Sequence, residues 1–108
     1  MTSRLRVLFD QGTPVPLRSL LVEHDVTTAF KLGWSTLSNG ELLTVAEGQF
    51  DVLITTDRRL HHEQNVRGRR LAILALPTTS WHRIQTHGDE IARAVASMMP
   101  GEYRELAW

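Results

Sequence analysis

Two aspartates stand where short apolar runs end. Asp10 follows the run at residues 5–9, and Asp57 closes the run at residues 51–57. Ligands of open parallel α/β sheets gather outside the carboxyl ends of the strands, so we expect both side chains to face one cleft. Neighbouring carboxylates repel unless a cation lies between them, and Mg²⁺ prefers such oxygen ligands. An aspartate after a strand also serves as a turn residue or a helix N-cap, and this alternative stays open for each.

The elements that would position these aspartates alternate along the chain. Continuous apolar strands joined by helical segments predict a single α/β domain over residues 1–108, in three α/β/α layers around a mostly parallel four-stranded sheet. The first strand should be central and adjacent to the third. The expected strands cover residues 5–9, 25–29, 51–57 and 70–76, and the expected helices cover 14–24, 38–48 and 80–99, with a short helix or turn at 58–62. Ser38 and Glu41 form a capping-box pattern at the start of the second helix, and Gly48 should end it.

Composition excludes several classes of protein. Twelve basic residues balance twelve acidic ones, and the absence of cysteine rules out disulfides and thiolate metal sites. No apolar run approaches the roughly 18–20 residues that span a bilayer, and no signal-peptide pattern opens the chain, so we expect a cytoplasmic protein. Five arginines lie within residues 58–70, where they would either bind phosphates or keep a solvated loop soluble.

Three blocks of the chain, at residues 8–14, 38–46 and 52–60, resemble those of small PIN-like proteins. These are compact relatives of the PIN-domain ribonuclease toxins of bacterial toxin–antitoxin modules. The resemblance covers about residues 4–76, with 77–108 as a C-terminal strand–helix and tail, and it matches Asp10 and Asp57 to two acids of the family. The chain departs from the family pattern at Gln11, Asn39 and Arg59.

The resemblance implies an Mg²⁺- or Mn²⁺-dependent endoribonuclease of toxin type. Asp10 and Asp57 would be the catalytic and metal-binding carboxylates, and Asn39 would be a weaker ligand. Glu41 is a further candidate ligand, although the capping box explains it without a metal. RNA phosphates would meet arginine and histidine side chains just after the third strand, namely Arg58, Arg59 and His61. An antitoxin encoded nearby and a second copy of the chain are the candidate protein partners.

Two other interpretations stay open. The domain could have lost catalysis and act as an RNA-binding or protein-interaction module, because Gln11, Asn39 and Arg59 replace usual acids. It could also be a doubly wound domain unrelated to RNA. The tail at residues 102–108 ends on Leu106 and Trp108, and it could fasten to the domain or bind a partner subunit.

Overall fold

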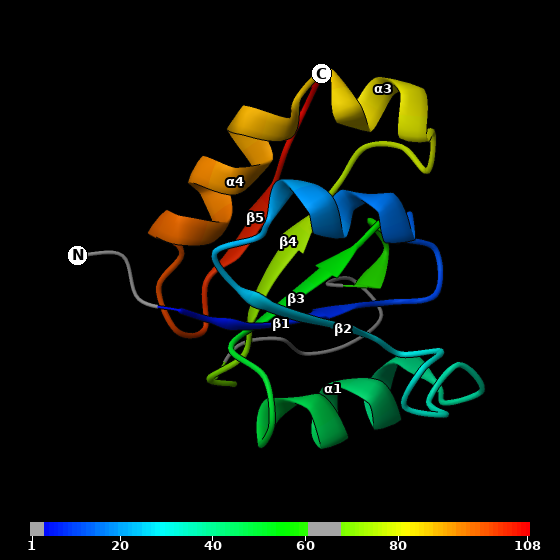
Figure 1. Cartoon of the computed structure of the whole chain (residues 1–108). Helices are drawn as coiled ribbons and strands as arrows, with labels where there is room; N and C mark the ends of the chain where they lie inside the picture. The colour runs from blue at the N-terminus through cyan, green and yellow to red at the C-terminus, as the bar shows by residue number, and fades with distance from the viewer. Residues whose placement is uncertain (1–3, 61–67) are drawn as a thin grey trace.

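The computed structural model describes residues 4–60 and 68–108, which form a parallel sheet of five strands. The strands lie in the order β2-β1-β3-β4-β5, so the first strand is adjacent to the third, as predicted (Figure 1). Every pair of neighbouring strands is parallel. The strands are β1 (Arg6–Phe9), β2 (Asp25–Thr28), β3 (Val52–Thr55), β4 (Ala72–Ala75) and β5 (Tyr103–Glu105). The α/β class is therefore confirmed, but the sheet has five strands rather than four.

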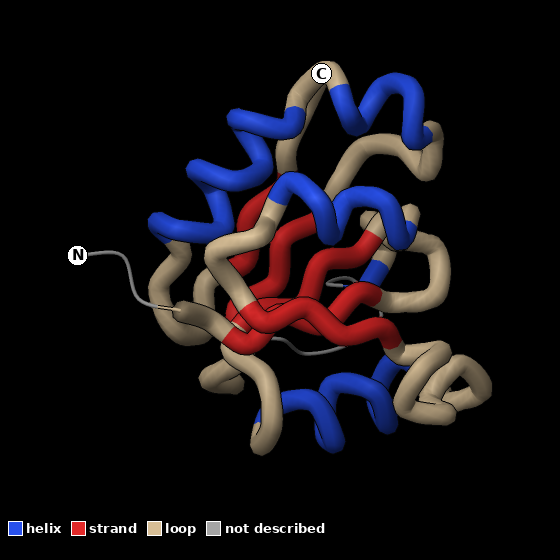
Figure 2. Tube along the Cα trace, in the orientation of Figure 1, coloured by secondary structure: helices blue, strands red, loops and turns tan. Residues whose placement is uncertain are grey.

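Helices cover both faces of this sheet. Helix α1 (Asn39–Glu47) lies on one face, and the 3-10 helix η1 (Val15–Leu20) lies on the other with α3 (Trp81–Gln85) and α4 (Gly88–Ser97) (Figure 2). The predicted capping box is present, because the Ser38 hydroxyl accepts from the Glu41 N–H and the Glu41 carboxylate accepts from the Ser38 N–H. In residues 4–60 and 68–108 no helix has both the length and the apolar content needed to cross a membrane.

Each central strand sends alternate side chains into one of two hydrophobic cores. Leu8, Leu53 and Ile73 pack under α1, whereas Phe9 and Ile54 pack under η1, α3 and α4. All five side chains are almost fully buried. Burial on both faces explains why these strands are continuous apolar runs in the sequence.

Two helical segments differ from the sequence prediction. The segment after Pro14 forms only a six-residue 3-10 helix in place of the longer helix expected over 14–24. The segment expected as one helix over 80–99 breaks at Thr86 and His87 into α3 and α4. A Cβ at Gly88 would lie 2.7 Å from a Leu20 methyl carbon, so the backbone approaches η1 closely there. The predicted short helix or turn at 58–62 lies partly outside the described residues.

The C-terminal tail adds the fifth strand and fastens to the domain. Tyr103–Glu105 pairs with β4, and the Trp108 ring stacks on His87 with centroids 4.0 Å apart. The Trp108 indole N–H also donates to the Glu90 carboxylate at 2.6 Å. Of the two predictions for the tail, attachment to the domain is therefore confirmed.

Candidate functional site

Asp10 stands at the end of β1 in a shell of hydroxyl and amide donors. Its backbone N–H donates to the Ile54 carbonyl at 3.1 Å, which joins it to β3. One carboxylate oxygen accepts from the Gly12 N–H at 3.2 Å and lies 2.8 Å from the Thr13 hydroxyl oxygen. The other accepts a short hydrogen bond from the Thr55 hydroxyl, whose side chain is fully buried. The orientation of this carboxylate is therefore fixed by three neighbouring residues, Gly12, Thr13 and Thr55.

Burial raises the pKa of Asp10 above its ordinary value, and the nearby charge of Asp57 raises it further. Hydrogen bonds from Thr55, Thr13 and Gly12 act in the opposite direction without cancelling the effect of burial. Among residues 4–60 and 68–108, no positively charged side chain contributes to this balance. Asp10 is thus a carboxylate that would gain from a nearby cation.

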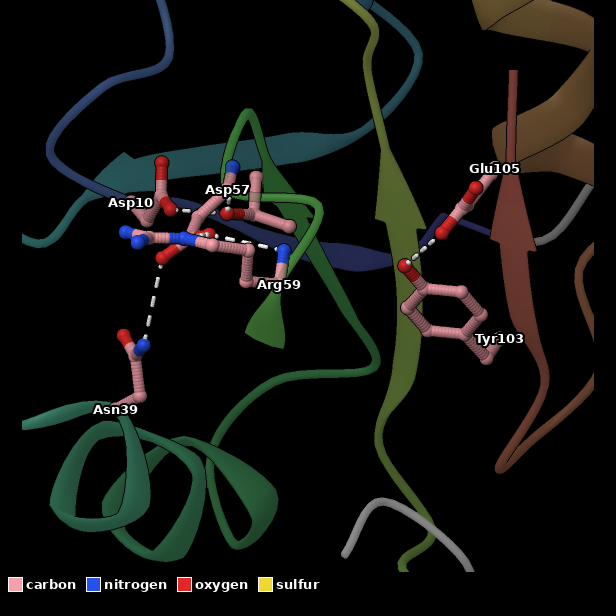
Figure 3. Close-up of polar contacts among 7 residues, drawn as sticks. Asp10, Asn39, Asp57, Arg59, Tyr103 and Glu105 are labelled. Atoms are coloured by element: carbon pink, nitrogen blue, oxygen red, sulfur yellow. Dashed lines mark hydrogen bonds and ion pairs between the residues drawn. The ribbon is translucent and has the colours of Figure 1, made fainter. Parts of the chain in front are cut away.

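Asp57 follows β3 and is connected to Asp10 through one hydroxyl group. The Asp57 N–H donates to the Thr55 oxygen at 3.0 Å, while the Thr55 hydroxyl donates its own proton to Asp10. The Asp57 carboxylate accepts from the Arg59 N–H at 3.0 Å and from the Arg59 guanidinium at 3.4 Å. Its second oxygen lies 3.5 Å from the Asn39 amide nitrogen (Figure 3). Residues of β1, β3 and α1 therefore meet at this point.

The pKa of Asp57 shifts in the opposite direction from that of Asp10. Its partial burial alone would raise the pKa, but the hydrogen bonds from Arg59 and Asn39 and the positive charge of Arg59 together lower it. The two carboxylates thus lie at one edge of the sheet, and their pKa values are shifted in opposite directions.

Both aspartates also act as turn residues. Each carboxylate accepts from a backbone N–H two residues later, Gly12 for Asp10 and Arg59 for Asp57. These are the local bonds that favour aspartate in turns. The turn interpretation of the sequence is therefore confirmed for both residues, and it coexists with their convergence on one edge of the sheet.

A cleft of about 230 Å³ opens between the two turns and the N-terminus of α1. The loop between β2 and α1 closes one side of it, and the turns after β1 and β3 form the other. The residues that line the cleft are Asp10, Gln11, Gly12, Ala29, Trp34, Ser35, Leu37, Asn39, Leu42, Thr56 and Asp57. The predicted cleft therefore exists, with Asp10, Asn39 and Asp57 in its wall. A larger groove of about 610 Å³ lies beside η1 and β2 and contains none of these three residues.

The cleft wall contains oxygen atoms of the kind that Mg²⁺ takes as ligands. Magnesium keeps several waters and needs only one or two protein carboxylates, which Asp10 and Asp57 could supply with an amide oxygen from Asn39. Within residues 4–60 and 68–108 no three or more histidine, cysteine, aspartate or glutamate side chains gather as a metal-binding group. The donor set therefore fits Mg²⁺ held largely by water and does not fit a closed protein cage.

Among the other predicted site residues, Glu41 and Arg58 lie apart from this group, whereas Arg59 contacts it. Glu41 is engaged in the capping box and does not line the cleft. Arg58 points to β5, where its guanidinium pairs with Glu105 at 2.8 Å. Arg59 is well exposed and contacts Asp57, while His61 lies outside the described residues.

Sequence reasoning missed the residues that hold the site in place. Thr13 and Thr55 contact Asp10 directly, and neither was among the predicted site residues. Tyr103 and Glu105 form a second polar group on β5, where the tyrosine hydroxyl donates to the glutamate at 2.7 Å (Figure 3). Burial and the Glu105 carboxylate raise the pKa of Tyr103, so its hydroxyl stays protonated. The sequence gives no local signal for this role of Thr55, because its hydrogen bond to Asp10 joins residues that are 45 positions apart.

Comparison of the chain with protein-family models, with curated proteins and with solved structures gave no match. The resemblance to PIN-like proteins therefore stays a prediction from the sequence blocks. Any functional inference depends on the chemistry of the cleft, which joins two unlike carboxylates and one amide.

Proposed function

We propose that the protein is a PIN-like, metal-dependent endoribonuclease that uses the cleft between Asp10 and Asp57. The convergence of two carboxylates at the ends of neighbouring parallel strands is the observation that carries this proposal. The raised pKa of Asp10 supports it, because a largely buried carboxylate that contacts no cation within the described part of the chain favours a divalent ion nearby.

Asp10, Asp57 and Asn39 would hold Mg²⁺ or Mn²⁺. When bound, the ion would lower the pKa of a water molecule and neutralise charge on the phosphodiester. Hydrolysis adds the water oxygen to phosphorus and breaks one P–O bond. The leaving oxygen takes up a proton, and the RNA strand is cut.

The residues around the carboxylates would prepare the site for this reaction. Thr13 and Thr55 fix the orientation of the Asp10 carboxylate, so that little reorganisation is needed when a cation arrives. Arg59 lies at the exposed side of Asp57, where its planar guanidinium would meet a phosphate of the RNA.

A specific contact favours a second candidate function, metal-independent RNA binding. Arg59 is paired with Asp57 and supplies the positive charge that a metal ion would otherwise bring. A cation in this position repels Mg²⁺ but attracts phosphate. In this alternative, the cleft binds RNA without cutting it.

Metal binding and RNA cleavage separate the two functions. Mn²⁺ affinity is measured by titration calorimetry, and cleavage of a labelled single-stranded RNA is measured with Mg²⁺, with Mn²⁺ and with chelator. The nuclease predicts that Asp10→Asn and Asp57→Asn each lower metal-dependent cleavage at least about 100-fold and weaken Mn²⁺ binding. Absence of Mn²⁺ binding at millimolar concentration, together with RNA binding in chelator, would overturn the nuclease in favour of the second function.

Asp25→Asn provides a matched control. Asp25 is an exposed acid paired with Arg4 at the opposite ends of the strands, and its replacement makes the same change of charge. We expect it to cleave RNA as the wild type does. Equal losses in all three variants would mean that net charge, rather than the cleft, governs the activity.

The toxin assignment has its own test. Expression of the chain alone should arrest growth of a bacterial host, and Asp57→Asn should relieve the arrest. Co-expression of an antitoxin encoded beside it should restore growth of cells that carry the wild type. Arrest that is equally strong with Asp57→Asn would count against toxicity through RNA cleavage.

A further inference from the structure

The loop between β2 and α1 carries a short turn with a well-defined shape. The Trp34 N–H donates to the Ala29 carbonyl at 2.8 Å and closes the turn. Inside it, the Lys31 N–H donates to the Thr28 hydroxyl at 3.1 Å. Gly33 has a φ of 75°, a conformation that favours glycine, and its N–H bonds to the turn as well. The tip, residues 30–33, is therefore held in place by backbone hydrogen bonds.

This tip stands at the rim of the cleft. Ala29 and Trp34, the residues on either side of it, both line the cleft with Asp10 and Asp57. In Figure 1 the loop, drawn in cyan, extends beyond the end of β2 beside the start of α1. A polymer whose phosphate lies in the cleft would thus have this tip next to its neighbouring nucleotides.

Phe30, at 78%, is the one exposed side chain among the phenylalanines, tyrosines and tryptophans of residues 4–60 and 68–108. Trp34 is engaged instead with Phe50, in an edge-to-face contact with centroids 6.1 Å apart. The exposed Lys31, the only lysine of the chain, follows Phe30 directly. An aromatic face beside a cation is the combination with which proteins bind single-stranded nucleic acid.

We propose that Phe30 and Lys31 form a subsite for single-stranded RNA, a proposal that rests on the proposed function of the cleft. Phe30 stacks on the base next to the cleft, and Lys31 pairs with the adjoining phosphate. Every base has a face that can stack, so the subsite tolerates all four bases. Paired bases in a duplex are not available for such stacking, so the subsite selects unpaired RNA.

A protein partner fits this tip less well. A stable protein interface needs about 800 Å² on each side and a cluster of apolar anchors. At the tip, Phe30 is accompanied only by Leu32, which is 38% exposed, and by a charged lysine. One projecting ring beside a cation suits a nucleobase better than it suits a protein surface.

Fluorescence anisotropy with a labelled single-stranded RNA of mixed sequence tests the subsite. Binding is measured in chelator, to prevent cleavage, and again with Mg²⁺ in the Asp57→Asn background. We expect Phe30→Ala to weaken binding about 10-fold or more, because each base–aromatic stack contributes on that scale. Phe30→Trp should keep the affinity, and RNA should quench its added indole fluorescence beyond the quenching seen in the wild type.

Val22→Ala is the matched control, because Val22 is 73% exposed but lies beside the larger groove and away from the cleft. It should bind RNA as the wild type does. Lys31→Ala should weaken binding less than Phe30→Ala and should lower the salt dependence of binding. A duplex of the same sequence should bind more weakly than the single strand, and its affinity should not depend on Phe30.

The outcomes separate this subsite from the nuclease. Binding that depends on Phe30 without metal-dependent cleavage would support the subsite and overturn the nuclease. Cleavage and binding that are both unchanged in Phe30→Ala would overturn the subsite alone. Absence of RNA binding, with self-association that Phe30→Ala abolishes, would overturn it in favour of a contact between copies of the chain.

Discussion

The ends of β1 and β3 resemble each other in geometry and differ in electrostatics. Asp10 and Asp57 each accept a backbone N–H two residues later, and the Thr55 hydroxyl bonds to both residues. Uncharged donors surround Asp10, whose pKa is raised, whereas the cation of Arg59 lowers the pKa of Asp57. Two equivalent strand ends can thus place carboxylates of unlike proton affinity side by side, as acid–base chemistry requires.

Removing the shared hydroxyl should have the largest effect. Thr55→Val keeps the shape of the buried side chain but leaves the Asp10 carboxylate without one donor and the Asp57 N–H without its acceptor. We expect a loss of about 3 kcal/mol in the free energy of unfolding, measured by urea denaturation at pH 7. Thr44→Val, which alters an exposed threonine of α1, should change it by less than about 0.5 kcal/mol. Equal stability of Thr55→Val and the wild type would show that the two ends are independent.

Contact between the two turns should have the next largest effect. A Cβ at Gly12 would lie 2.5 Å from the Thr56 hydroxyl oxygen, so Gly12→Ala forces one turn to move. We expect a loss of about 1–2 kcal/mol in thermal unfolding, and Thr56→Ala in the same chain should restore most of it. Gly48→Ala is the control, since a Cβ there has no neighbour within 4 Å. An additive double mutant would mean that the two turns do not touch.

Neutralising each carboxylate should change stability in opposite directions. Because folding raises the pKa of Asp10, its ionisation costs stability as the pH rises from the ordinary value of 3.8 through the folded pKa. Asp10→Asn should therefore be more stable than the wild type at pH 7, and the gain should vanish in acid. Chemical denaturation from pH 3 to pH 8 measures the difference.

Asp57 contributes with the opposite sign, since folding lowers its pKa. Its contribution is present above the unfolded pKa and is lost as the pH falls through the folded value. Asp57→Asn should therefore cost stability at pH 7, by no more than about 0.5 kcal/mol, because the pair with Arg59 is largely exposed. If Asp10→Asn and Asp57→Asn change the free energy of unfolding in the same direction in this pH series, the two strand ends do not differ in electrostatics as described.

The smallest effect concerns the cation at the end of β3. Arg59→Ala should raise the pKa of Asp57 towards the ordinary value of an aspartate. The pKa of Asp10 should stay above that ordinary value. Carbon-13 NMR of the side-chain carboxyls follows both titrations. Mn²⁺ affinity should increase a few-fold with the loss of the competing charge. Arg58→Ala is the control, because Arg58 pairs with Glu105. An unchanged Asp57 titration in Arg59→Ala would mean that this cation does not set the difference between the two ends.

The sequence predicted the strands that can be recognised from the residues of the strand alone. Residues of β1, β3 and β4 are buried on both faces of the sheet. Such burial requires continuous apolar runs, which can be recognised in the sequence. Tyr103–Glu105 gave no such pattern, because this short edge strand is only half-buried. Similarly, the break between α3 and α4 depends on the approach of Gly88 to Leu20, a contact between distant segments.

The same distinction applies to the site. Asp10 and Asp57 could be located because strand ends mark their positions in the sequence, whereas Asn39 was expected only from the resemblance to PIN-like proteins. The direction of Arg58 could not be predicted, since it depends on Glu105 of a strand that the sequence did not predict. The role of Thr55 depends on a hydrogen bond across 45 residues, which no local pattern encodes.

The buried hydroxyl of Thr55 also restricts which residues β3 can accept at position 55. β3 is otherwise a row of interior positions where larger aliphatic residues are tolerated, and residue 55 lies among them with no exposed surface. In a saturation-mutagenesis screen for folded protein, we expect Ser to be accepted at position 55 and Val, Ile and Leu to be depleted. The neighbouring positions 53 and 54 should show the reverse preference. A preference for hydroxyl residues over aliphatic residues at one interior position would then locate the site. The stability screen alone would give this result, without any assay of activity.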